Sequence, residues 1–191
     1  MTSSAAARPS TPVLADLVPW AWVRDVVLVG AFTVALAASS QLGFTLPGTP
    51  VPVTAQTFVV LLGAAALGPV RAGVGAAAFL TVGALGVPWF AVSGGTTLGY
   101  LAGFVLAAIL VGRLARAGWT RTYRGAAAAM VLGNLAIYVV GASVLAVLLG
   151  LGPGAALAAG VIPFLLGDAL KVAAATVLLP SVQRAVERAD A

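Results

Sequence analysis

Cysteine and histidine are both absent from the 191 residues of this chain, and charged residues are scarce. Without cysteine there is no disulfide and no thiolate metal site, and without histidine the commonest general base and metal ligand is missing. These absences disfavour redox, zinc and Ser-His chemistry. Only 8% of the residues are charged, whereas about one quarter are charged in a soluble domain.

Apolar residues are abundant instead. They make up 61% of the chain, and the mean hydropathy is +1.10, which predicts an integral, multi-pass membrane protein. With about 20 residues needed for each span, a chain of this length has room for about five or six helices and for no second domain.

Charges, prolines and glycines divide the apolar residues into six segments. The sequence predicts helices over residues 24–41, 54–67, 71–86, 97–115, 124–149, and from 155 or 163 to 179, with Pro180 ending the last one. The second and third segments are short for a hydrocarbon core of about 30 Å, so we expect them to be tilted, extended by the preceding loop or not fully spanning.

The predicted fold class is therefore an all-α membrane bundle of six transmembrane helices. Residues 21–182 form this membrane domain. Residues 1–20 have no compact apolar core after a basic start, so they are predicted to be a flexible cytoplasmic tail rather than a cleaved signal. Residues 183–191 are predicted to be a short basic cytoplasmic tail.

Basic residues fall on one side of the predicted topology. Apart from Lys171, they precede the first helix, lie between the second and third or the fourth and fifth, or follow the sixth; the connections at 43–53, 87–96 and 150–154 carry no charge. Basic residues favour the cytoplasmic side, so both termini are predicted to be cytoplasmic. A basic cytoplasmic rim also explains the net charge of +5 without nucleic acid.

Asp168 and Lys171 are the only charged residues inside an apolar stretch long enough to be membrane. An ionisable group there costs roughly 2.5–3.5 kcal/mol on insertion scales, so it usually has a partner or a function. Residues at i and i+3 of a helix project from one face. The pair therefore indicates either a ligand site or a structural salt bridge between helices.

The first uncharged connection contains Pro47, Pro50 and Pro52. Proline disfavours helix for itself and for the preceding residue, so this segment is predicted to be an extended strap. With Thr54, Gln56 and Thr57 at its end, the strap is suited to cover a pocket and to hydrogen-bond to its contents. The alternative is a plain connection between helices.

Five stretches of the chain resemble the BioY family, the biotin-binding S components of energy-coupling-factor (ECF) transporters. They are TPVPVTAQTFVVLLG at 49–63, LGP at 67–69, GVPWFA at 86–91, GYLAGF at 99–104 and PFLLGDALK at 163–171. The resemblance implies a six-helix bundle whose ligand site opens to the outside. It also implies a transmembrane T component and a pair of ATPases as partners, with Ala31 and Ala35 of the first helix on the docking surface.

Biotin as transported ligand, with no cofactor, suits the residues identified above. A mostly apolar pocket with a few convergent polar groups fits its apolar rings and chain, its ureido group and its carboxylate. We expect Asp168 to accept from the ureido N–H groups, and Lys171 to pair with a ligand oxygen or to hold Asp168 ionised. The opposite orientation of the ligand is left open.

Other residues complete the predicted polar lining of the site. They are Thr54, Gln56 and Tyr100. Asn134 and Tyr138 lie one turn apart on the fifth predicted helix, a spacing that puts them on one face without saying which one.

Two other functional classes remain as alternatives. A solitary proton-coupled carrier would use Asp168 as its titrating group. An intramembrane enzyme has Ser93 and Ser143 as candidate nucleophiles but lacks a base to activate them. The chain has no GxxxxGK[ST] phosphate-binding loop, so an ATP-driven step would belong to another polypeptide.

Overall fold

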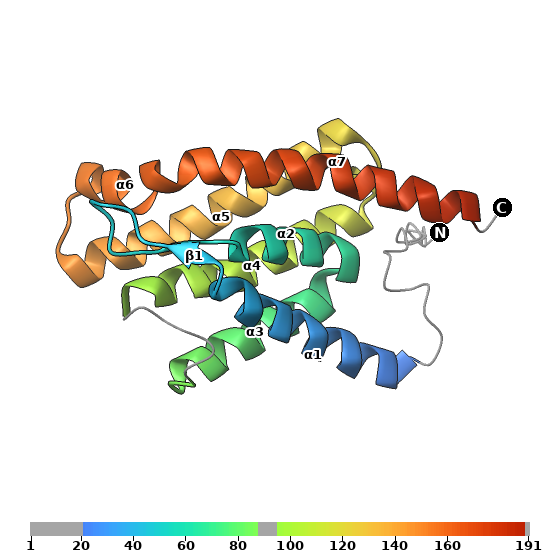
Figure 1. The fold of residues 1–191 in the computed structure, drawn as a ribbon, viewed down its shortest axis with the longest axis horizontal. Helices are drawn as coiled ribbons and strands as arrows, with labels where there is room; N and C mark the ends of the chain where they lie inside the picture. The colour runs from blue at the N-terminus through green and yellow to red at the C-terminus, as the bar shows by residue number, and fades with distance from the viewer. Residues whose placement is uncertain (1–20, 88–94, 190–191) are drawn as a thin grey trace, which may run out of the picture.

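The computed structural model describes residues 21–87 and 95–189, which form an elongated helical bundle (Figure 1). The helices are α1 (Ala21–Ser40), α2 (Gln56–Leu67), α3 (Pro69–Ala84), α4 (Gly95–Arg116), α5 (Tyr123–Leu149), α6 (Pro153–Gly160) and α7 (Leu165–Ala189), with the 3-10 turns η3 (Trp119–Arg121) and η4 (Ile162–Phe164). The predicted tail at 1–20 and most of the predicted loop at 87–96 lie outside the described residues.

Four helical segments are long and apolar enough to cross a membrane, consistent with the predicted multi-pass class. They are Trp22–Ser40, Gly95–Arg116, Tyr123–Leu149 and Pro153–Ser181. The apolar helices α2 and α3 have 12 and 16 residues, and at 1.5 Å per residue they are only about 18 and 24 Å long. This agrees with the expectation that both are short for a span, while the predicted count of six transmembrane helices stays a prediction.

Helix α4 lies at the centre of the bundle, between α5 on one side and α2 and α3 on the other, while α1 packs on α3 and α7 on α5 (Figure 1). Glycines let the helix backbones approach closely. A Cβ placed on Gly103 would lie 2.9 Å from the Ile137 Cα atom, and one on Gly112 would lie 2.5 Å from the Pro69 nitrogen. Small residues at helix crossings are typical of membrane bundles.

The last helical segment differs from its prediction in two ways. The predicted single segment is two helices. The first, α6, starts at Pro153, near the candidate start at 155, and ends at Gly160; the chain then re-enters helix through η4, near the candidate start at 163. Pro163 has no N–H for a continuous helix. The prediction that Pro180 ends the helix is wrong: α7 continues to Ala189, with Pro180 inside it. Transmembrane helices tolerate proline where other groups satisfy the freed backbone atoms.

The proline-containing strap has no helix, as predicted, and it is extended at its two ends. Its ends form the two-residue strands β1 (Gly43–Phe44) and β2 (Val53–Thr54), paired antiparallel with Gly43 opposite Thr54. The Ala55 N–H donates to the Leu42 carbonyl at 3.0 Å, which closes the base of the strap. In Figure 1 the strap extends across the end of the bundle opposite the C-terminus of α7.

We expect Gly103→Ala to lower the stability of the protein, because the added methyl group would overlap the α5 backbone. Overpacking of this kind typically costs about 1–3 kcal/mol. Gly30→Ala is the matched control, since a Cβ there would have no atom within 4 Å. The measurement is the thermal unfolding midpoint in detergent, and equal midpoints for the two variants would contradict this packing.

Candidate functional site

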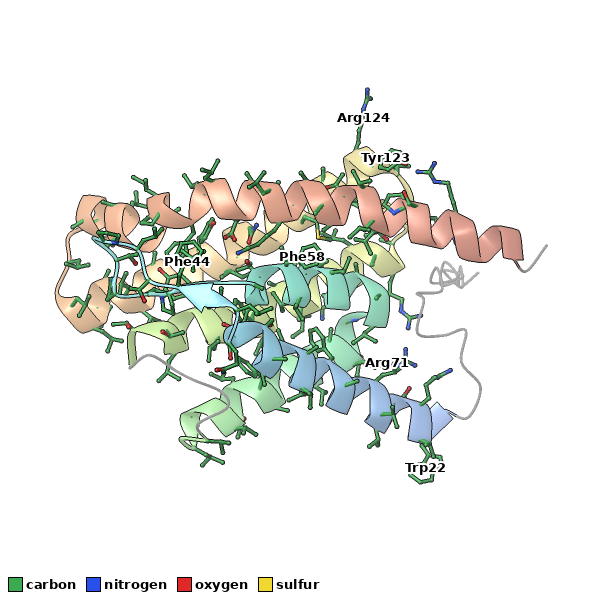
Figure 2. All side chains as sticks on the ribbon, in the orientation of Figure 1. Trp22, Phe44, Phe58, Arg71, Tyr123 and Arg124 are labelled. Atoms are coloured by element: carbon green, nitrogen blue, oxygen red, sulfur yellow. The ribbon has the colours of Figure 1, made fainter. Side chains whose placement is uncertain are left out.

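A cavity of about 270 Å³ lies beneath the strap, at the end of the bundle where Figure 2 labels Phe44. The strap, α2, α4, α5, η4 and α7 all contribute to it. Its walls combine apolar and aromatic side chains with a few polar ones: Ser40, Gly43, Phe44, Thr45, Val51, Pro52, Thr54, Gln56, Thr57, Thr97, Tyr100, Phe104, Ile137, Tyr138, Phe164, Asp168 and Lys171. All five residues predicted to bind the ligand are among them.

Asp168 lies in the first turn of α7 and is 3% exposed. Its Oδ1 atom accepts hydrogen bonds from Thr57 Oγ1 and Lys171 Nζ, both at 2.9 Å. Its Oδ2 atom accepts from the Tyr138 hydroxyl at 2.6 Å. The carboxylate is thus held by α2, α5 and its own helix, which provides the partners that a buried charge requires.

Lys171 connects α7 to the strap. Besides Asp168, its ammonium group donates to the Thr54 carbonyl oxygen at 2.6 Å and to Thr57 Oγ1 at 2.8 Å. A lysine ammonium has three donors, and these three bonds use all of them. The i, i+3 ion pair expected from the sequence is therefore present, and it is also tied to the end of the strap.

The other predicted residues are arranged around this pair. Thr54 Oγ1 donates to Gln56 Oε1 at 3.0 Å, and the Gln56 side chain is buried. The Tyr100 hydroxyl donates to the Gly160 carbonyl at 2.7 Å, the oxygen that lies where α6 breaks. Tyr100 therefore fixes the position of η4, whose Phe164 ring lies 6.0 Å from its own ring between centroids.

Sequence reasoning missed several parts of the site. It left Tyr138 unassigned, although this residue lines the cavity and binds Asp168 directly. It also missed the aromatic walls Phe104 and Phe164. Phe104 and Phe164 lie within the motifs GYLAGF and PFLLGDALK, which could have identified them, whereas Tyr138 lies outside all five stretches that carry the resemblance.

Asn134 faces a different space from the one beneath the strap. It lines a second cavity of about 450 Å³ between α5 and α7, together with Thr176. Its Oδ1 atom and the Thr176 Oγ1 atom are buried without a hydrogen-bond partner. Tyr138 and Asp168 line both cavities, so their hydrogen bond forms part of the partition between them.

Comparisons with known proteins identify the family of this chain. The sequence profile of the BioY family matches residues 6–188, nearly the entire chain. This chain belongs to the BioY family. The motifs that carried the resemblance, including those containing Thr54 and Asp168, fall within the matched region.

Relatives from distant organisms carry the same family name. "Biotin transporter BioY" of Thermotoga maritima is 33% identical over 174 residues, which cover 87% of this chain and 100% of that protein. "Biotin transporter BioY" of Rhizobium etli is 30% identical, covering 81% of this chain and 90% of its own. "Probable biotin transporter BioY" of Pyrococcus horikoshii is 32% identical, covering 84% of this chain and 96% of that protein.

A solved structure shares the fold. It is described as the S-component for biotin from an ECF-type ABC transporter, and it superposes with a TM-score of 0.75 at 21% identity, covering 85% of this chain and 92% of that one. The S-component architecture expected from the sequence is confirmed at the level of the fold. Proteins of this family are transporters and not enzymes, in agreement with the prediction that the chain has no catalytic function.

Tyr138→Phe should destabilise the ligand-free protein more than Tyr100→Phe does. Both changes remove one hydroxyl, but Tyr138 donates to a buried carboxylate and Tyr100 to a neutral carbonyl. Hydrogen bonds to charged groups contribute roughly 1.5–3 kcal/mol and neutral ones about 0.5–1.5 kcal/mol. The two variants are compared by denaturant titration, and a larger loss for Tyr100→Phe would disagree with the described bonding.

Proposed function

We propose that this protein captures biotin and serves as the substrate-specificity subunit of a vitamin uptake transporter in the cell membrane. The observation that carries the proposal is the cavity beneath the strap, which is lined by the buried Asp168 and its partly buried partner Lys171 together with Thr54, Gln56 and Tyr100. Membership of the BioY family supports biotin as the ligand. Polar groups at one end of a mostly apolar cavity suit a ligand with a polar ureido ring and an apolar body.

Asp168 is the residue best prepared to bind a ligand donor. A carboxylate has about four lone-pair sites, and Asp168 uses two at Oδ1 and one at Oδ2. One site at Oδ2 remains for an N–H group. A ureido nitrogen carries such a group, so the proposed contact requires no existing bond to break.

Lys171 is in the opposite situation, because its three donors are all occupied. A ligand oxygen can reach it only by replacing the Thr54 carbonyl, the Thr57 hydroxyl or Asp168. We therefore assign Lys171 first to neutralising and orienting Asp168, the second of the two roles expected from the sequence. A direct contact with a ligand oxygen requires exchange with one of these partners.

Aromatic side chains are proposed to contact the apolar part of the ligand. Tyr100, Phe104 and Phe164 line the cavity from α4 and η4. Aromatic rings contribute large contact areas with few rotatable bonds, which suits a small fused-ring ligand. Because Tyr100 is bound to Gly160, the position of this wall depends on the break between α6 and α7.

The partners proposed for transport are an ECF T component and ATPase subunits. The chain contains no phosphate-binding loop motif of its own. On α1, Ala31 is exposed and Ala35 is partly exposed, and Val27 and Val34 beside them are 60% and 64% exposed. Small residues with exposed apolar neighbours allow a partner helix to approach closely, which supports this face of α1 as the docking surface.

The orientation proposed for the protein places both termini in the cytoplasm. Figure 1 shows that the start of α1, the junction of α2 with α3, and the end of α7 lie at one end of the bundle. Figure 2 labels Arg71 and Arg124 at the same end. The positive-inside rule supports the cytoplasmic assignment for this end and an outward-facing strap.

Asp168→Asn and Lys171→Ala should each weaken biotin binding by well over tenfold. The first places an amide N–H against groups that already donate, and the second leaves a buried carboxylate uncompensated, a change that costs about 3–5 kcal/mol. Asp25→Asn, the same substitution at the other end of the bundle, is the matched control and should retain the affinity. Isothermal titration calorimetry measures all three, and unchanged affinity in both site variants would refute the assignment.

Ala31→Leu combined with Ala35→Leu should abolish co-purification of the T component while leaving biotin binding intact. The added side chains would hold a partner helix away from α1. Ala174→Leu, an exposed position on α7, which forms the other edge of the bundle in Figure 1, is the control. Normal assembly of the α1 variant, together with failure of the α7 variant, would show that the docking surface lies on α7 and not on α1.

A requirement for the ATPase subunits would distinguish the proposed transporter from a solitary proton-coupled carrier. Biotin uptake by cells with and without the ATPase subunits is compared, with and without an uncoupler. We expect uptake to require the ATPases. Uptake that persists without them and collapses with the proton gradient would favour the carrier in which Asp168 titrates.

A further inference from the structure

The cavity beneath the strap has a buried end and an exposed mouth. Asp168 and Gln56, which are 3% and 5% exposed, lie at the buried end, whereas Phe44, which lines the same cavity, is 62% exposed. Gly43 and Thr45 beside it also line the cavity and are exposed. Figure 2 labels Phe44 on the strap. A ligand that fills this cavity would therefore have one end among buried polar groups and the other end near solvent.

Positive charge in this cavity is confined to its buried end. Lys171 is the one basic residue among the described residues that line it. The uncharged connections at 43–53, 87–96 and 150–154 contain no lysine or arginine in their sequences. At the mouth, the side chain of Thr45 offers a neutral hydroxyl group. A ligand carboxylate at the mouth would therefore meet water and neutral groups rather than a cation.

A ligand carboxylate at the buried end would be opposed by Asp168. Lys171 Nζ already donates to Asp168 Oδ1 at 2.9 Å and to two further oxygens, so a second carboxylate would have to displace one of these three partners. It would also lie beside a like charge in a buried surrounding, which is unfavourable. The open lone pair of Asp168 favours an N–H donor instead. The ureido ring of biotin is thus suited to the buried end, and its carboxylate to the mouth.

We infer that the protein also captures amides of biotin, including the amide with the side-chain amino group of lysine, because it recognises the ureido ring and not the charge of the tail. This inference rests on the proposed function and assigns the ligand orientation that the sequence left open. A carboxylate that stays in water gains little from an exposed contact, so its conversion to a neutral amide removes little affinity. A tail that ends at an exposed mouth can also be extended into solvent.

Isothermal titration calorimetry of the full chain with biotin, biotinamide and the lysine amide of biotin tests this inference. We expect both amides to bind within about fivefold of biotin, which corresponds to the loss of one exposed ionic contact at most. Biotin methylated on its ureido nitrogens is the matched control ligand. It keeps the carboxylate but has no ureido N–H to donate to Asp168, so it should bind more than about tenfold more weakly than biotin.

A cation added at the mouth provides a second test. Thr45→Lys should raise the preference for biotin over biotinamide by about twofold to fivefold, because the new ammonium group can pair with the carboxylate but not with the amide. Thr81→Lys is the matched control, since it places the same charge at an exposed position on α3 that does not line the cavity. It should leave the preference unchanged.

Three results would overturn this inference. One is binding of biotinamide more than tenfold weaker than that of biotin, which would place the carboxylate at Lys171 and leave the proposed function intact. Another is an equal effect of Thr45→Lys and Thr81→Lys on the preference. The third is failure of the unmodified protein to bind biotin itself, which would refute the proposed function as well. The thermal unfolding midpoint of each variant verifies that a change in binding does not come from loss of the fold.

Discussion

The charged pair of Asp168 and Lys171 is the constraint on which the end of the bundle beneath the strap depends. Buried charges in an apolar surrounding are tolerated only with hydrogen-bonding partners. The partners come from separate elements: Thr57 from α2, Tyr138 from α5 and the Thr54 carbonyl from the strap. The positions of these three elements are thereby coupled to the first turns of α7.

This network also bears on selectivity. A buried ion pair contributes little net stability, because the cost of removing two charges from water offsets their attraction. The value proposed for it lies in the one acceptor site that Asp168 leaves open among the described residues. In the proposed site, a ligand with a correctly placed N–H group would gain a charge-assisted hydrogen bond, while a ligand without one would leave the carboxylate desolvated and incompletely paired.

The sequence predicted the parts of the molecule that follow from local chemistry. Asp168 and Lys171 stood out because charges are rare in apolar segments, and the strap because proline fixes its own backbone. The order of the helices followed from charge and proline spacing. All of these signals lie within a few neighbouring residues.

What could not be predicted depends on contacts between distant segments. Tyr138 binds Asp168 only because α5 packs beside α7, whereas Asn134, one turn away, faces another cavity. The break after Gly160 is stabilised by Tyr100, sixty residues earlier in the chain. Pro180 was expected to end a helix that in fact continues, with Arg184 Nε donating to the Pro180 carbonyl at 3.0 Å.

The opposite charges of Asp168 and Lys171 cancel, so this pair gives the cavity beneath the strap no net charge. A monoanionic cargo of the kind proposed would give the loaded site one net negative charge. Moving that charge completely across a membrane with a negative interior costs about 2.3 kcal/mol for each 100 mV. Inward transport would therefore work against the membrane voltage, and the energy source must supply this electrical work in addition to any concentration gradient.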